Sequence, residues 1–253
     1  MRQCIFCDAK ADTAERIFPD WIGKVITNTE IEVEVVTLTE DGYTSCRNYP
    51  AKGAAGQRAK VVCGTCNGGW MSDLQGEAKP LLVPLVAGKP KGLTTVEQLL
   101  AAEWAIKTAM VGETVMRYVN AFSQEDRELV RREHRPPLRA GVHAASYAVD
   151  EPHATRFFRV VLGTSLDNAP VADVYINTIQ IGHLILQVRG THSFPATDNR
   201  ALERIAVPNE VEIPLWPPVE RCEWPPLNIL NEAALQLYAT GGNEPPPKPP
   251  RSG

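Results

Sequence analysis

Val61-Val62-Cys63-Gly64-Thr65-Cys66-Asn67-Gly68-Gly69-Trp70 is the stretch of this sequence that decides its fold. It contains a Cys-x-x-Cys pair, and a second pair with the same spacing stands near the start of the chain, at Cys4 and Cys7. Two such pairs can close one tetrahedral thiolate site, which zinc favours because it is borderline-soft and brings no geometric preference of its own. The sequence therefore predicts a structural zinc ion with four thiolate ligands and no open position: Cys4, Cys7, Cys63 and Cys66.

The residues around the two pairs predict a treble-clef zinc module. Residues 31–38 begin with strict alternation of apolar residues and Glu, which is typical of a half-buried strand. Residues 41–60 are rich in Gly, Ala and polar groups and are predicted to form a loop. Asn67-Gly68-Gly69 then turns the chain toward a helix that we expect to begin near Trp70 or Ser72. First pair, hairpin, second pair and helix follow one another as in a treble clef.

The composition restricts the partners and the compartment. A chain of 253 residues has room for a small zinc module and a larger domain. Its formal net charge of -4 argues against a generally basic nucleic-acid coat, so any contact with phosphate must come from a local patch. No run of about 18 apolar residues exists, so no membrane span is expected. The start at Met1 lacks the apolar core of a signal peptide, so we expect a cytoplasmic protein whose cysteines bind metal.

A local basic patch does occur, just before the second cysteine pair. After Asp41 no acidic residue follows until Asp73, which makes this the most basic part of the zinc region. Basic side chains without neighbouring acids suit contacts with a phosphate backbone. The candidate nucleic-acid-binding residues are Arg47, Lys52, Arg58 and Lys60.

Residues 77–210 are predicted to form an α+β domain that begins with helices. Apolar residues recur at helical spacing between about 95 and 118, and Ser123 opens another candidate helix. Pro80 and Pro84 interrupt the segment that precedes these two helices, so any helix in that segment is expected to be short. The helices are expected to cover one face of a sheet that follows them.

The later part of the domain changes to a period of two. Its alternating segments predict the strands of an antiparallel sheet: 142–149, 155–162, 171–181 and 183–189. Gly182, between the last two, is expected to mark a bulge or a kink rather than a full turn. The predicted fold class is therefore α+β, with a zinc module followed by helices and an antiparallel sheet. The expected divisions are 1–76 for the zinc module, 77–210 for the α+β domain, and 211–253 for a proline-rich segment with a disordered tail.

Two stretches together resemble the HNH endonucleases. They are Glu15-Arg16-Ile17-Phe18-Pro19-Asp20-Trp21 and the segment from Cys63 to Gln75, CGTCNGGWMSDLQ. The chain resembles bacterial and phage proteins of HNH type that carry the signatures EHIFPxW and CxxCNxGWMSxLE. The resemblance covers roughly the first 110 residues, and the combination of the two stretches is more specific than either one.

The resemblance implies a metal-dependent nuclease site with one position altered. HNH enzymes hold one divalent cation over a ββα fold, and a His at the end of the first strand deprotonates the attacking water. By the resemblance, Glu15 and Asn67 match the metal-binding acid and the helix ligand, so Mg or Mn is expected between them. Arg16 stands where the base should be, and arginine cannot lose a proton at usable pH. Gln57 and Arg58 occupy the stretch where the family has its base-orienting Asn. The candidate catalytic residues are Glu15, Arg16 and Asn67.

Two alternatives stay open for Arg16, and three for the whole protein. The Arg16 guanidinium is suited either to clamp a phosphate or to pair with Glu15 in place of the cation. The protein is then a nucleic-acid-binding HNH-like protein with an impaired phosphodiesterase site, or an active metal-dependent nuclease whose base comes from elsewhere. The third alternative is a zinc-stapled scaffold for a protein partner, because a likeness at the level of the fold transfers structure better than activity.

Overall fold

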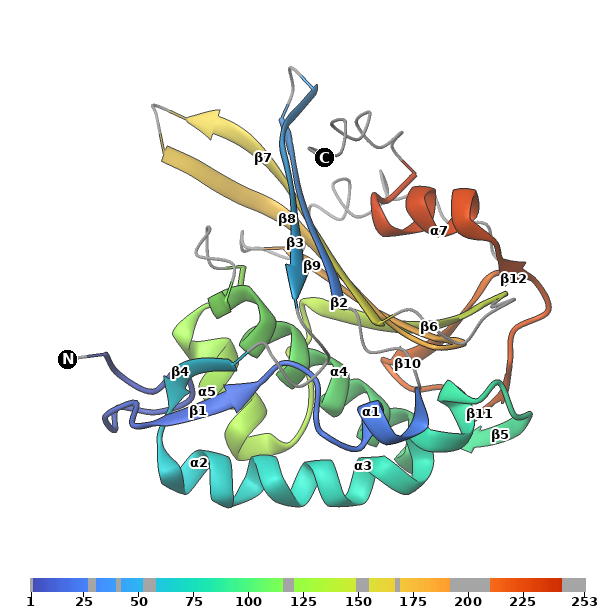
Figure 1. The fold of residues 1–253 in the computed structure, drawn as a ribbon, viewed down its shortest axis with the longest axis horizontal. Helices are drawn as coiled ribbons and strands as arrows, with labels where there is room; N and C mark the ends of the chain where they lie inside the picture. Colours follow the sequence, from blue (N-terminus) through green and yellow to red (C-terminus); the bar gives the residue numbers. More distant parts are fainter. Residues whose placement is uncertain are drawn as a thin grey trace.

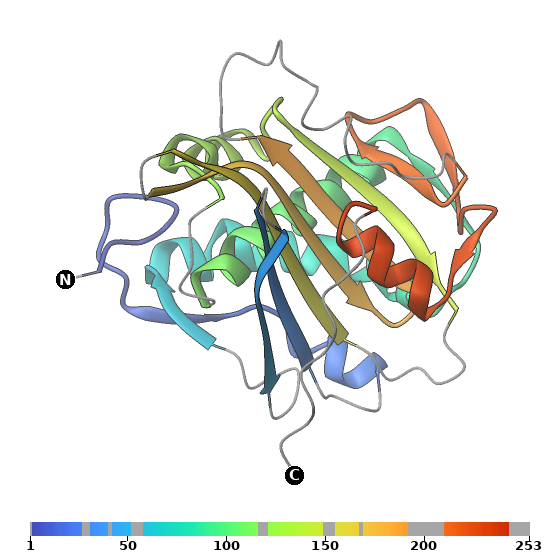
Figure 2. The same ribbon diagram turned by 90° about the horizontal axis from the view of Figure 1, so that it is seen from above.

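A mixed sheet of eight strands forms the centre of the molecule, with helices on both of its faces (Figures 1 and 2). The structure is a computed structural model, and it describes residues 2–26, 31–39, 42–51, 58–115, 121–148, 155–166, 169–191 and 210–242. Seven strands follow the order β10-β6-β9-β8-β7-β2-β3, and β12 pairs with β6. The strands of this sheet are β2 (Ile31–Thr39), β3 (Gly42–Ala51), β6 (Ala140–Tyr147), β7 (Thr155–Leu166), β8 (Ala169–Ile181), β9 (Leu184–Thr191), β10 (Glu212–Trp216) and β12 (Ile229–Leu230).

The α+β fold class predicted from the sequence is confirmed. The strands after residue 138 pair antiparallel from β7 to β10, as their alternating pattern predicted. Two pairings are parallel, β2 with β7 and β12 with β6. Between β8 and β9 the chain makes a full turn at Gly182 and His183, so the expectation of a bulge or kink was wrong. Gly182 has φ +56, and a Cβ there would lie 2.7 Å from the carbonyl oxygen of Val86.

The hairpin between the two cysteine pairs lies in the large sheet. Residues 42–51 form strand β3, paired antiparallel with β2, so the loop predicted over 41–60 was wrong for this part. The Gly and Ala residues that suggested a loop are concentrated in 51–56, at and beyond the end of the strand. Because β2 also pairs with β7, the hairpin extends the sheet rather than standing beside the cysteines. The division into 1–76, 77–210 and 211–253 stays a prediction.

Two long helices lie beneath the sheet in the view of Figure 1. Of these, α4 (Thr95–Val115) is buried along most of its length, and α3 (Trp70–Val86) packs against its far side. Helix α3 runs through Pro80 and Pro84, although these prolines predicted a short helix. Its buried residues recur every three to four positions, from Met71 to Leu85, and their burial against α4 outweighs the lost backbone hydrogen bonds.

The remaining elements frame these layers. Helix α5 opens at Ser123, as the sequence predicted, and Ser123 and Asp126 form a capping box there. Helix α7 covers the opposite face of the sheet, with Leu235 and Tyr238 buried. Strand β1 pairs with β4, and β5 pairs with β11, each as a small antiparallel ladder. These elements are β1 (Thr13–Arg16), α1 (Ile22–Val25), β4 (Arg58–Val62), α2 (Gly64–Gly68), β5 (Lys91–Thr94), α5 (Gln124–Glu133), β11 (Arg221–Trp224) and α7 (Glu232–Ala239).

One continuous core joins the cysteine region to the rest. Phe6 and Phe18 from the N-terminal segment, Trp104 from α4 and Leu186 from β9 all belong to the same cluster of buried side chains. The cysteine region is therefore packed onto α3 and α4, and α4 in turn is packed onto the sheet. Helix α4 contacts β4 of the cysteine region on one side and strands of the large sheet on the other.

Candidate metal centre and adjoining pocket

The four predicted cysteines come together at one point. Their Sγ atoms all lie within 4.8 Å of one another, and none forms a disulfide. The Sγ atom of Cys7 lies 3.7 Å from the Sγ atoms of both Cys63 and Cys66. Four sulfurs at about 2.3 Å from a tetrahedral zinc ion stand about 3.8 Å apart, so these separations fit a zinc site.

The protonation chemistry of the thiols also favours a cation there. Burial raises the pKa of the Cys4 and Cys66 thiols above the ordinary value. Burial also favours a higher pKa for the Cys63 thiol. The backbone N–H of Cys66 donates a hydrogen bond to Cys63 Sγ, however, and this bond helps to bring the pKa of Cys63 below the ordinary value. Thiolates crowded in an apolar site need a compensating positive charge. A structural zinc ion supplies that charge through the four sulfurs.

The cysteine cluster holds together the elements that carry the candidate catalytic residues. The first pair leads into β1, and the second pair ends β4 and opens α2, so the cluster ties the strand of Glu15 to the helix of Asn67. The Asn67 side-chain amide donates to Thr13 Oγ1 at 3.2 Å, and the Thr13 hydroxyl donates to the carbonyl of Val62 at 3.0 Å. β1, β4 and α2 thus follow one another in ββα order, whereas the strand predicted over 31–38 lies in the large sheet as β2 and the helix expected from Trp70 or Ser72 is α3.

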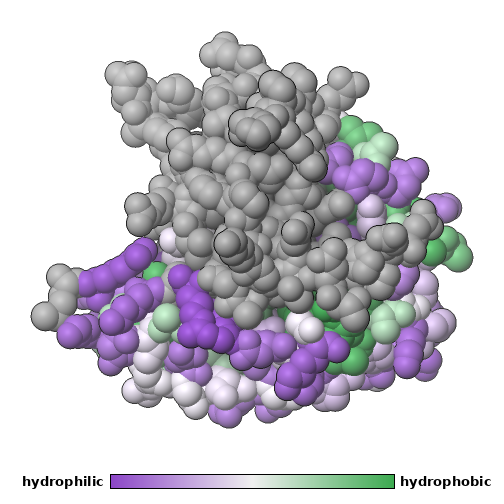
Figure 3. All heavy atoms as spheres, viewed as in Figure 1, coloured by the Kyte–Doolittle hydropathy of each residue, from purple (hydrophilic) through white to green (hydrophobic). Residues whose placement is uncertain are grey.

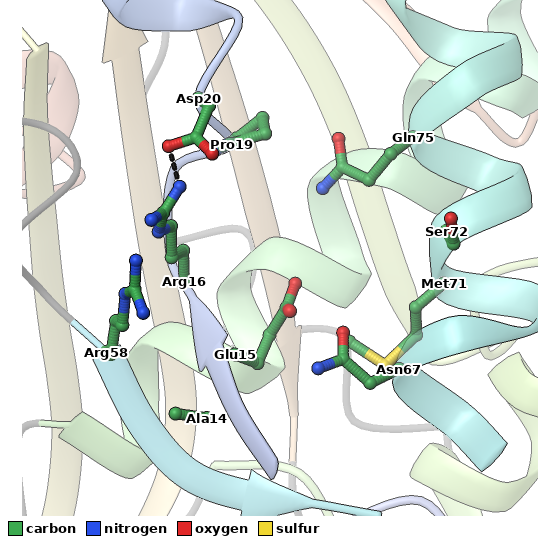
Figure 4. A pocket seen from close by; sticks show the side chains of 10 residues that line it. All are labelled: Ala14, Glu15, Arg16, Pro19, Asp20, Arg58, Asn67, Met71, Ser72 and Gln75. Carbon is green, nitrogen blue, oxygen red and sulfur yellow. Dashed lines mark ion pairs between the residues drawn. The ribbon is translucent and has the colours of Figure 1, made fainter. Parts of the chain in front are cut away.

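A pocket of about 380 Å³ opens between β1, β4 and the helices α2 and α3 (Figure 4). Glu15, Arg16 and Asn67 all line it, although Asn67 is distant from the other two in sequence. Arg58 joins them from β4, where its backbone pairs directly with that of Arg16. The full lining is Ala14, Glu15, Arg16, Pro19, Asp20, Arg58, Asn67, Met71, Ser72 and Gln75. Hydrophilic side chains dominate the described part of this lower face of the molecule (Figure 3).

Glu15 is paired with a lysine that the sequence did not single out as a site residue. Lys107, in the middle of α4, is fully buried, and its Nζ lies 3.7 Å from Oε1 of Glu15. Burial raises the pKa of Glu15 and lowers the pKa of Lys107, and the opposite charge of each partner counteracts the shift of the other. The sequence does carry a signal of this buried charge, because Lys107 stands within the largely apolar run from Trp104 to Met110.

Arg16 does not pair with Glu15, so that alternative was wrong. Its guanidinium forms an ion pair with Asp20, four residues further along the chain, at the rim of the pocket. Arg58 is exposed, and no ion pair of Arg58 with any described carboxylate is found. Arg58 is therefore the guanidinium that gives the pocket its unbalanced positive charge.

The basic patch predicted before the second cysteine pair is only partly visible. Arg58 lines the pocket, whereas Lys60 is exposed on β4 and is not part of the pocket lining. Arg47 belongs to β3, but its side chain lies outside the described residues, and so does all of Lys52. Whether the four basic residues act together stays a prediction.

No model of a protein family, no curated protein and no solved structure matches this chain. The four-cysteine cluster is what the structure supports of the resemblance to HNH endonucleases, and the assignment to that family stays a prediction. Among the described helices, none is both long enough and apolar enough to span a bilayer.

Proposed function

We propose that this protein binds nucleic acid through an HNH-like, zinc-stapled site that takes up a backbone phosphate but does not hydrolyse it. One observation carries the proposal: Arg16 and Arg58 line one pocket, while the charge of Glu15 in that pocket is balanced from behind by Lys107. The cysteine cluster would hold the zinc ion that keeps β1 and α2 in place around this pocket.

The charge balance of the pocket favours an anion. Glu15 with Lys107 and Arg16 with Asp20 each form a neutral pair, which leaves the positive charge of Arg58 without a counterpart among the lining residues. A guanidinium is planar and presents paired donors that match phosphate oxygens. The pocket therefore suits a phosphate group, in a protein whose overall charge is negative.

The same residues argue against hydrolysis. Arg16 stands at the place of the base in the resemblance and cannot accept a proton, and no histidine is among the residues that line the pocket. Glu15, the expected metal ligand, already interacts with the Lys107 ammonium. Among the described residues, the pocket thus has groups that hold a phosphate and none placed to activate water.

The active nuclease is the second candidate function, and one observation favours it. Glu15 and Asn67 point into the same pocket (Figure 4), as a metal site built from these two residues requires. In that case Mg²⁺ or Mn²⁺ would bind between them, and the base would come from elsewhere. The protein-binding scaffold is favoured by no residue of the pocket.

One experiment separates the three functions. Zinc-loaded protein is mixed with labelled single-stranded and double-stranded DNA and RNA, with and without Mg²⁺ or Mn²⁺, over a range of salt. We expect binding that weakens steeply with salt and no cleavage. Cleavage that is lost in Glu15→Ala supports the active enzyme, and the absence of both binding and cleavage leaves the scaffold.

A further inference from the structure

Lys107 stands out among the buried polar groups of the described residues because its ammonium has a single charged partner, the Glu15 carboxylate. It comes from the centre of α4, and its side chain has no exposed surface. Its Nζ has no hydrogen-bond partner among the described residues. A buried ammonium normally needs paired hydrogen bonds, and without them it is costly to keep. Its nearest described carboxylate oxygen belongs to Glu15, which faces the pocket.

The surroundings hold Lys107 close to the pocket. The ring of Trp104 lies 5.8 Å from the Lys107 Nζ, measured to the ring centroid. The Trp104 indole N–H donates to Oε1 of Gln75 at 2.8 Å, and Gln75 lines the pocket. The lysine therefore lies behind the wall of the pocket, with Glu15 between its ammonium and the open space.

We propose that Lys107 is the resident cation of this pocket: its ammonium neutralises Glu15 from behind the wall, so Glu15 does not hold a divalent metal and the pocket binds phosphate without one. Lys107 is thus a positioning residue that acts through Glu15. The part of this inference that concerns phosphate rests on the proposed function, whereas the exclusion of metal does not.

The exclusion of a divalent metal follows from charge repulsion and from the small number of oxygen ligands that the pocket offers. A divalent cation bound to Glu15 would stand close to the Lys107 ammonium, and two positive charges at such a distance in a poorly solvated site repel strongly. Hard cations such as Mn²⁺ and Mg²⁺ also need several oxygen ligands. In the pocket, Glu15 offers a carboxylate already paired with Lys107, and Asp20 is paired with Arg16.

Binding of Mn²⁺ to the zinc-loaded protein, followed by electron paramagnetic resonance, tests the inference directly. The wild-type protein is expected to show no Mn²⁺ binding that depends on Glu15, so wild type and Glu15→Gln give the same titration. Lys107→Met shortens the side chain by one atom and removes the charge, and it is expected to bind one Mn²⁺ at least about tenfold more tightly. That gain is expected to disappear in the double variant Lys107→Met/Glu15→Gln. Lys79→Met, at an exposed position on α3, is the matched control and is expected to behave as wild type.

Two results would overturn the proposal. One is wild-type protein that binds Mn²⁺ as tightly as Lys107→Met and loses it in Glu15→Gln. The other is a folded, zinc-loaded Lys107→Met that gains no affinity. Should Lys107→Met not fold, the comparison of wild type with Glu15→Gln still decides whether metal binds at Glu15. Because no nucleic acid is present in these titrations, a failure of the proposed function leaves their outcome unchanged.

Discussion

Nζ of Lys107 lies 3.7 Å from Oε1 of Glu15, and this pair joins the central helix α4 to the first strand of the cysteine region. The lysine has no exposed surface, and the Glu15 side chain is 13% exposed. Removing one partner from such a pair leaves a buried charge without compensation, whereas removing both together costs much less. The pair therefore contributes to stability as a unit.

A double-mutant cycle on this pair gives the first prediction. Glu15→Gln leaves the buried ammonium of Lys107 unpaired and is expected to lower the free energy of unfolding by about 3 to 5 kcal/mol. Lys107→Met/Glu15→Gln is expected to recover most of that loss, which urea unfolding of the zinc-loaded proteins measures. Effects of the two substitutions that simply add would show that Lys107 and Glu15 do not interact.

The second prediction concerns zinc. Cys63→Ala removes one of four ligands and is expected to abolish stoichiometric zinc and to unfold the region around β1 and α2, since structural zinc contributes on the order of 10 kcal/mol to folding. Metal analysis and the near-ultraviolet circular dichroism of the tryptophans check both effects. Cys222→Ala is the control, because Cys222 lies on β11 outside the cluster. Full zinc content in Cys63→Ala would rule out the four-thiolate site.

The third prediction is a dependence of stability on pH through His143, on β6. Burial lowers the pKa of His143 to about 4, and the nearby Arg189 adds to this, while Glu212 opposes it. The unfolded chain, with the ordinary value of 6.5, binds more protons than the folded protein between these two pH values. Stability therefore falls as pH drops from about 6.5 to about 4, by at most about 3 kcal/mol from this residue.

His143→Gln isolates that contribution from the carboxylates that titrate in the same range. The variant is expected to lose less stability than wild type between these pH values, as followed by urea unfolding at each pH. Identical pH profiles for the two proteins would mean that His143 titrates normally in the folded state.

The fourth prediction concerns the missing base. Arg16→His restores the residue type that the resemblance expects, but Lys107 still faces Glu15. We therefore predict no cleavage of plasmid DNA by Arg16→His with Mg²⁺ or Mn²⁺. Cleavage is expected only when Lys107→Met is added, because Glu15 is then free to bind the metal. Cleavage by Arg16→His alone, absent in Arg16→Gln, would show that the base was the one missing part.

The sequence predicted the cysteine cluster and the start of helix α3 at Trp70, because the spacing of the cysteines and the Asn-Gly-Gly turn are local signals. It also placed Glu15 and Asn67 at one site through the resemblance. The pairing of Glu15 with Lys107 could not be predicted, since it depends on how α4 lies against β1, whereas Arg16 and its partner Asp20 are only four residues apart. Strand β3 was missed because its ten residues carry no clear alternation, and its place is set by pairing with β2.

Helix α3 shows the same limit of local reasoning. Two prolines in its sequence predicted an interruption, yet the helix continues from Trp70 to Val86. Its apolar residues, such as Leu74 and Leu82, are buried in the core, and this tertiary contact decides the outcome over the local preference of proline. The residues of α3 that line the pocket, which include Gln75, all precede Pro80, so this wall does not depend on the helix continuing past the prolines.

The central claim, that the pocket takes up a phosphate of nucleic acid, is tested most directly by fluorescence anisotropy of a labelled single-stranded oligonucleotide without divalent metal. Arg58→Gln is compared with wild type and with Arg221→Gln, an exposed arginine on β11. We predict that wild type and Arg221→Gln bind alike. Arg58→Gln is expected to bind about tenfold more weakly, with a salt slope reduced by about 1. Equal binding by all three proteins, or no binding by wild type, would contradict the account.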